Sequence, residues 1–97
     1  MIIELKKFGV TLISRQTGRE AFSAINPVLK DLKDGENIEI NFDGVITFSP
    51  SWGDEFLTLL SDKYGSRLVL MNTNNPSVRA TLEILEKTAN GKFNIIN

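Results

Sequence analysis

The chain has 97 residues, of which 41% are hydrophobic and 24% are charged, and this length suits one domain over residues 1–97. Its net charge is −1 and its basic residues are scattered, so neither a nucleic acid nor an anionic membrane is expected as a partner. The absence of cysteine and histidine excludes disulfides, thiolate chemistry, a Ser-His-Asp triad and the commonest transition-metal ligands.

The first stretch, MIIELKKF, lacks the long apolar core of a signal peptide, and no apolar run approaches membrane length, so we expect a cytoplasmic protein.

The apolar segments predict five strands. The segment around Ile40 alternates apolar and polar residues, whereas 68–71 is continuously apolar, as in a strand covered on both faces. In chain order, the predicted strands are residues 2–5 (an edge strand), 10–13, 38–42, 68–71 and 93–96.

Three amphipathic helices are predicted between these strands, each with a start signal. Ser14 and Thr17, the latter with Glu20 in a capping box, precede the first helix, Ser51 precedes the second, and Asn75-Pro76 precedes the third. Pro27 is expected to kink or restart the first helix. The predicted helix ends are marked by Gly35, Gly65 and Gly91.

The predicted order is β-β-α-β-α-β-α-β, which defines an α/β fold with parallel neighbouring strands. Loops that leave strands and enter helices gather at one edge of such a sheet, where open α/β folds bind their ligands. Three loops meet this description: Ser14–Gly18, Phe48–Asp54 and Asn72–Pro76.

Ser51 is the principal candidate site residue. We predict that its hydroxyl caps the second helix by accepting the N–H of Asp54, and its place at an exposed turn also makes it a candidate phosphoacceptor. Asp54 and Glu55 suit the first turn of that helix, because the helix dipole favours negative charge there. Adjacent helical residues point about 100° apart, so we do not expect these acids to form a catalytic pair. A Mg²⁺ site that they share with Asp43 is only weakly indicated.

Other loop residues complete the candidate binding edge. Arg15 is expected either to pair with Asp54 or Glu55 or to contact an anionic ligand. Trp52 is an interface anchor if it is exposed at the helix start, and part of the core if it is not. The polar loop residues Asn72, Asn74 and Asn75 provide a wall for a partner or a ligand.

Three segments resemble a known family: LISRQTGREAFSAI, IEINFDGVITFSPSWGDEFLTLL and YGSRLVLMNTNNPSV. Together they cover roughly residues 10–85 and resemble the STAS-like domains of bacterial proteins, which are related to anti-sigma factor antagonists and sulphate transporters. The resemblance implies a STAS-like fold, with a central mixed, mostly parallel sheet flanked by about three helices.

The resemblance also implies a role for the turn before the second helix. In STAS antagonists this turn reads Asp-Ser-Ser-Gly. An ATPase-fold kinase, which is also the anti-sigma factor, phosphorylates the second serine, and this phosphorylation releases the complex between the two proteins. Ser51 matches that serine, while Ser49, Pro50 and Trp52 stand at the aspartate, the first serine and the glycine.

We therefore expect a non-enzymatic regulatory module, without a cofactor, whose partner is a kinase-like ATPase or another anti-sigma-type regulator. The alternative is a sensor that binds a nucleotide or another anion through Arg15 and the helix N-termini. A hydrolase that uses Asp54 or Glu55 is the least supported reading.

Overall fold

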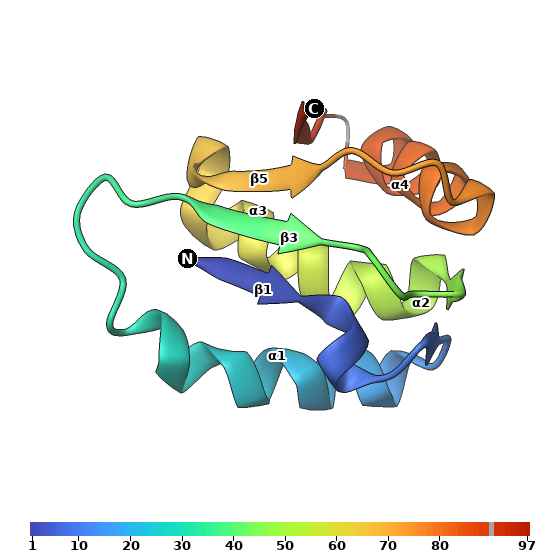
Figure 1. The fold of residues 1–97 in the computed structure, drawn as a ribbon, viewed down its shortest axis with the longest axis horizontal. Coiled ribbons are helices and arrows are strands. Elements are labelled where there is room, and N and C mark those ends of the chain that lie inside the picture. Colours follow the sequence, from blue (N-terminus) through green and yellow to red (C-terminus); the bar gives the residue numbers. More distant parts are fainter. Residues whose placement is uncertain (90) are drawn as a thin grey trace.

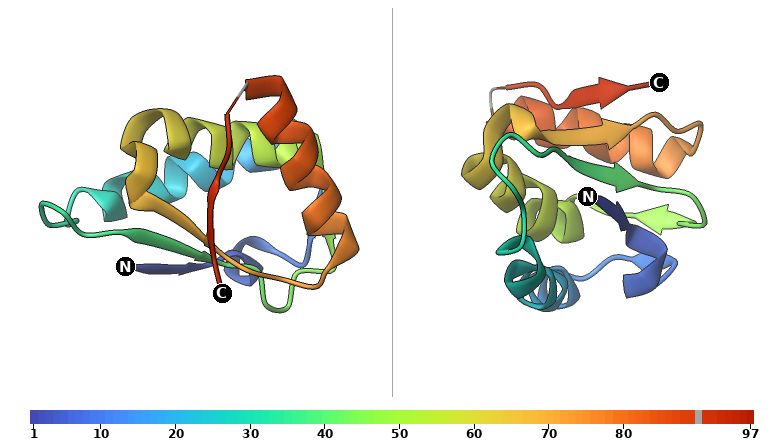
Figure 2. Two further views of the ribbon diagram at one scale, coloured as in Figure 1. Left: turned by 90° about the horizontal axis from the view of Figure 1, so that it is seen from above. Right: turned by 60° about the vertical axis from the view of Figure 1, so that its left-hand side comes forward.

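A four-stranded parallel sheet organises the computed structural model, which describes residues 1–89 and 91–97 (Figure 1). Its strands lie in the order β1-β3-β5-β6, which is also their order along the chain. Right-handed crossovers that always advance in one direction place their helices on the same face of the sheet, and Figure 2 shows the helices gathered on one face. The strands are β1 (Ile2–Glu4), β3 (Ile38–Asn41), β5 (Leu68–Met71) and β6 (Asn94–Ile96).

The register of these strands explains the buried face. Ile40 pairs with Ile3 on one side and with Leu70 on the other, and all three side chains are buried beneath the helices. The continuously apolar run 68–71 is confirmed as β5, in which Leu68, Val69 and Leu70 are all buried. β1 is an edge strand, as its sequence predicts.

Three helical segments flank the sheet, in agreement with the predicted number. They are α1 (Arg15–Leu29), a second segment that runs from Pro50 to Tyr64, and α4 (Pro76–Ala89). The second segment consists of α2 (Pro50–Gly53), a π-helical turn η2 (Asp54–Thr58) and α3 (Leu59–Tyr64), and its backbone stays helical at both junctions. Two short 3-10 turns, η1 (Leu5–Phe8) and η3 (Gly65–Arg67), precede β2 and β5.

A second, two-stranded parallel sheet was not predicted as such. It pairs β2 (Thr11–Leu12) with β4 (Thr47–Phe48). The sequence pattern predicts a single strand between the first two helices, but the chain makes two, separated by a turn in which Gly44 has a φ of 88°. Strand β4 has only two residues, which is too short for a periodic signal.

Several predicted helix signals differ from the structure. Ser14 alone caps α1, and Thr17 lies inside the helix and donates its backbone N–H to the Ser14 hydroxyl, so the Thr17–Glu20 capping box is wrong. No new helix starts at Pro27, because α1 continues through this residue and ends two residues later at Leu29. Gly65 ends α3 with a positive φ, as predicted, whereas Gly35 lies six residues beyond the end of α1.

The helices approach one another closely at Gly18 and Gly53. A Cβ atom at Gly18 would lie 2.7 Å from the backbone oxygen of Trp52, and one at Gly53 would lie 2.8 Å from the side chain of Leu85. These glycines let α2 contact α1 on one side and α4 on the other, because a bulkier residue would overlap its neighbour. The start of α2 is therefore held between two helices.

Candidate functional site

The serine that caps α2 is Ser49, so the predicted cap at Ser51 is wrong. The Ser49 hydroxyl accepts the backbone N–H of Trp52 at 3.2 Å and donates to the carbonyl oxygen of Ile13. Pro50 explains the shift: its fixed φ and missing N–H suit the first helical position, so the cap is the residue before it. Ser49 thereby joins the end of β2 to the start of α2.

Ser51 lies at the second helical position, in the first turn of α2, and is half-buried. Its hydroxyl makes no hydrogen bond with any residue in the ranges 1–89 and 91–97. The two serines of this turn therefore differ in kind. The Ser49 hydroxyl is occupied as donor and as acceptor, whereas the Ser51 hydroxyl has no hydrogen-bond partner among the described residues.

Arg15 forms an ion pair with both acids at the start of η2. Its Nη1 atom lies 2.9 Å from Oδ2 of Asp54 and 2.9 Å from Oε1 of Glu55, and Arg19 approaches the same Glu55 oxygen at 3.5 Å. Hydrogen bonds to Asp54, and then to Glu55, raise the pKa of the Arg15 guanidinium. Of the two predicted alternatives for Arg15, the structural ion pair is the one observed.

The convergence of Asp54 and Glu55 corrects the argument from helix geometry. Adjacent residues were expected to diverge, yet both carboxylates reach one nitrogen atom of Arg15. The two acids are the first residues of the π-helical turn η2. Two arginines and two acids form a charge cluster of zero net charge, which we call the Arg15 cluster: Arg15, Arg19, Asp54 and Glu55.

Trp52 belongs to the core and does not serve as an interface anchor. Its side chain is 1% exposed. The centroid of its indole ring lies 4.9 Å from that of Phe56, 5.7 Å from that of Phe48 and 6.3 Å from that of Phe8. A partner that docks at the start of α2 cannot reach this ring.

The three asparagines of the loop after β5 have different surroundings. Asn75 caps α4, since its Oδ1 accepts the N–H groups of Ser77 and Val78, and its Nδ2 donates to the carbonyls of Val45 and Ile46. Asn72 bonds to the Thr73 N–H and to the Asn97 side chain. Asn74 is exposed. Of the three asparagines predicted to form a polar wall, Asn75 therefore uses both its side-chain oxygen and its side-chain nitrogen in hydrogen bonds within the fold.

Ser77 and Thr81 are structural residues that sequence reasoning missed. The Ser77 hydroxyl accepts the N–H of Phe48 at 2.9 Å, and the Thr81 hydroxyl donates to the carbonyl oxygen of Phe48. These bonds hold α4 against β4, one residue before the Ser49 cap. Ser77 directly follows Pro76, the first residue of α4, so its place near a helix start could be read from the sequence. Its hydrogen-bond partner Phe48 could not, because Phe48 lies 29 residues away in the sequence.

The three predicted loops do lie together. Arg15 joins the first loop to the second through Asp54 and Glu55, and Asn75 and Ser77 join the third to the segment that leads into the second. No group of three or more potential metal-ligating side chains occurs in the described part of the chain. Among the same residues, no helix has the length and apolar character needed to cross a membrane.

A parallel sheet with helices on one face, and a serine-bearing turn at the strand ends, defines an α/β domain of the kind that the sequence segments resemble. Residues 25–78 match the model of a family described as a STAS-like domain of unknown function (DUF4325). This match covers more than half of the chain, and the protein belongs to that family. It includes the start of α2 and the loop after β5, but not Arg15. Searches of curated proteins and of solved structures gave no match.

Proposed function

We propose that this STAS-like domain is a regulatory protein-interaction module, without catalytic activity of its own, that docks a partner at the start of α2. We further propose that the partner is a kinase-like ATPase that transfers the γ-phosphoryl group of ATP to Ser51. In this step the Ser51 oxygen forms the new bond to phosphorus, its proton leaves, and ADP is released.

The observation that carries the proposal is the state of the Ser51 hydroxyl. It lies in the first turn of a helical segment and has no hydrogen-bond partner among the described residues. A phosphate at this position would face the positive end of the helix dipole. Phosphorylation would not remove the cap of the helix, because Ser49 supplies it.

The Arg15 cluster supports a charge-driven response to this modification. Ser51 precedes Asp54 by three residues and Glu55 by four, so it lies about one helical turn before both acids. Asp54 and Glu55 alone would repel a phosphate on Ser51, but Arg15 and Arg19 compensate their charge. Only Nη1 of Arg15 contacts the carboxylates in the described structure. Its remaining N–H groups are available to a phosphate that adds about −1.5 to −2 charges.

Exposed apolar side chains beside this turn favour a protein as the partner. Ile13 is 52% exposed, and its carbonyl oxygen accepts the Ser49 hydroxyl. Val10 and Ile46 are also exposed and are joined by a backbone hydrogen bond of 2.8 Å. An apolar surface next to a charged cluster is typical of a docking site that combines contact area with orientation.

The alternative of an anion sensor through Arg15 gains no support from these contacts. An anion sensor would depend on a guanidinium whose charge two carboxylates already balance, whereas the exposed apolar side chains favour a protein as the partner. We therefore keep the regulatory module as the proposed function.

Incubation of the purified domain with ATP and an extract of its native host, followed by intact-mass measurement, tests the proposal. The wild-type chain should gain the mass of one phosphate, and Ser51→Ala should not. Ser49→Ala is the matched control, because it removes the neighbouring hydroxyl and leaves Ser51 in place. A phosphate that persists in Ser51→Ala, or no modification of the wild type, contradicts the proposed phosphorylation.

A further inference from the structure

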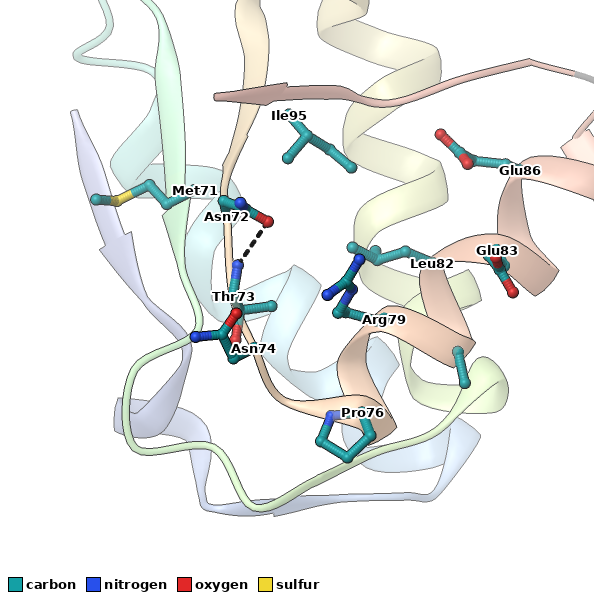
Figure 3. Close-up of a pocket in the computed structure, with 11 residues that line it drawn as sticks. Met71, Asn72, Thr73, Asn74, Pro76, Arg79, Leu82, Glu83, Glu86 and Ile95 are labelled. Atoms are coloured by element: carbon teal, nitrogen blue, oxygen red, sulfur yellow. Dashed lines mark hydrogen bonds between the residues drawn. The ribbon is translucent and has the colours of Figure 1, made fainter. Parts of the chain in front are cut away.

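A second candidate site lies between α4 and the ends of β5 and β6, and it borders the loop after β5. A cavity of about 500 Å³ opens there (Figure 3). One wall is formed by the loop after β5, another by α4, and Ile95 of β6 closes the upper end of the view. The sequence analysis named Asn72 and Asn74, which line this cavity, as part of a wall for a partner or a ligand, but no sequence pattern singled out Arg79 or Glu86.

Arg79 supplies the positive charge of the cavity. Figure 3 shows its guanidinium extending from α4 toward Asn72 and Thr73. Glu83 follows four residues later, at a spacing that often gives an ion pair. No ion pair or hydrogen bond of the Arg79 side chain is formed within residues 1–89 and 91–97. The guanidinium is therefore available to an anionic group.

Glu86 supplies negative charge farther along the same helix. Its Oε2 atom accepts the backbone N–H of Phe93 at 2.8 Å, which fixes the carboxylate beside the segment that leads into β6. Its Oε1 atom has no partner in the described part of the chain. Glu83 is the second carboxylate of the lining. Together, Glu83, Glu86 and Arg79 give the cavity lining a net charge of −1.

Apolar surface lies between these charges. Leu82 follows Arg79 by three residues and precedes Glu86 by four, so the three side chains share one side of α4. Leu82 is almost fully buried, and Ile95 faces it from β6. Because a helix rises 1.5 Å per residue, the positions of Arg79 and Glu86 are about 10 Å apart along its axis.

We propose that this cavity binds a short linear zwitterion, with a carboxylate and an ammonium group at opposite ends of an aliphatic chain. Arg79 binds the carboxylate, Leu82 and Ile95 contact the methylene groups, and Glu86 binds the ammonium. A simple carboxylate would meet two acidic side chains, and a simple amine would meet Arg79. The zwitterion alone matches the order of charge, apolar surface and opposite charge. This proposal is independent of the one for Ser51.

A titration followed by ¹H–¹⁵N NMR with three ligands of matched length tests this assignment. We expect 6-aminohexanoate to shift the amide signals of Asn72–Asn74, Leu82 and Ile95 and to saturate with a Kd of about 1 mM. Hexanoate lacks the ammonium and hexylamine lacks the carboxylate, so each should bind at least tenfold more weakly.

Substitutions then separate the two charged contacts. Arg79→Gln and Glu86→Gln should each weaken 6-aminohexanoate binding at least tenfold, and the glutamine at position 86 can still accept the Phe93 N–H. Lys87→Gln, on the same helix but outside the cavity lining, should leave the affinity unchanged. The assignment is overturned if hexanoate binds as tightly as the zwitterion, if Arg79→Gln binds normally, or if no saturable shift occurs at ten times the expected Kd.

Discussion

The contact between α1 and α2 and the cavity between α4 and β6 each contain an arginine and two acidic residues, but they use them in opposite ways. At the first, Gly18 allows a close approach, Trp52 is buried, and Arg15 is paired with two acids. At the second, all three residues of β6 are exposed, and Arg79 lies over a cavity with two acids of its own. The same charge types are satisfied within the fold in one region and face a cavity in the other.

This difference separates two kinds of function. In the α1–α2 region the charges are paired and the aromatic side chain is buried, which suits the proposed response through the surface or through modification of Ser51. The α4–β6 region has space and uncommitted charge, which suits a small ligand. Each region therefore predicts its own response to substitution.

Truncation of the buried aromatic residue should give the largest effect. Trp52→Ala should lower the free energy of unfolding by about 3–5 kcal/mol, because it removes a large core side chain and leaves a cavity among three phenylalanine rings. Ile95→Ala, in the cavity between α4 and β6, should cost less than about 1 kcal/mol, since Ile95 is 46% exposed. Urea unfolding monitored by far-UV circular dichroism measures both. Equal losses would show that the two regions are packed alike.

The sequence was sufficient for the main sheet and for the class of fold. The run at 68–71 and the alternation around Ile40 report burial directly, because each strand contributes its own apolar face. Family resemblance added the position of the serine turn. These signals are local, and they survive without knowledge of the tertiary contacts.

The site was less predictable because its contacts are not local. Arg15 is separated from Asp54 by 39 residues, and the π-helical turn that begins at Asp54 has no sequence signature of its own. The cap is a different case: Ser49 and Ser51 are both good capping residues, and the intervening Pro50 decided between them. The cavity at Arg79 depends on how β6 lies against α4, which no local pattern specifies.

The two serines of the turn give an effect of intermediate size. Ser49→Ala should lower the free energy of unfolding by about 1 kcal/mol, because the helix loses its cap and the carbonyl of Ile13 loses a donor. Ser51→Ala should change it by no more than about 0.5 kcal/mol, since no internal hydrogen bond is lost. Thermal unfolding of the unmodified proteins distinguishes them. A larger loss for Ser51→Ala would return the capping role to Ser51.

The smallest expected effect compares the two arginines. Arg15→Gln should lower the urea midpoint slightly at low salt and leave it nearly unchanged in 1 M NaCl, because exposed ion pairs are weak and are screened by salt. Arg79→Gln should leave the midpoint unchanged at both salt concentrations, since Arg79 has no ion pair among the described residues.

The pH dependence of the Arg15 effect follows from the direction of its pKa shift. Its contacts with Asp54 and Glu55 raise the pKa of Arg15, so its stabilising contribution is complete below the pKa of the unfolded chain and is lost only as the pH rises through the higher folded value. The difference in urea midpoint between wild type and Arg15→Gln should therefore stay constant from neutral to moderately alkaline pH.

The comparison of the two arginines also tests the proposed ligand site. A midpoint loss in Arg79→Gln that matches that of Arg15→Gln would mean that Arg79 is already paired in solution. The cavity would then lack the unpaired guanidinium that its proposed ligand requires.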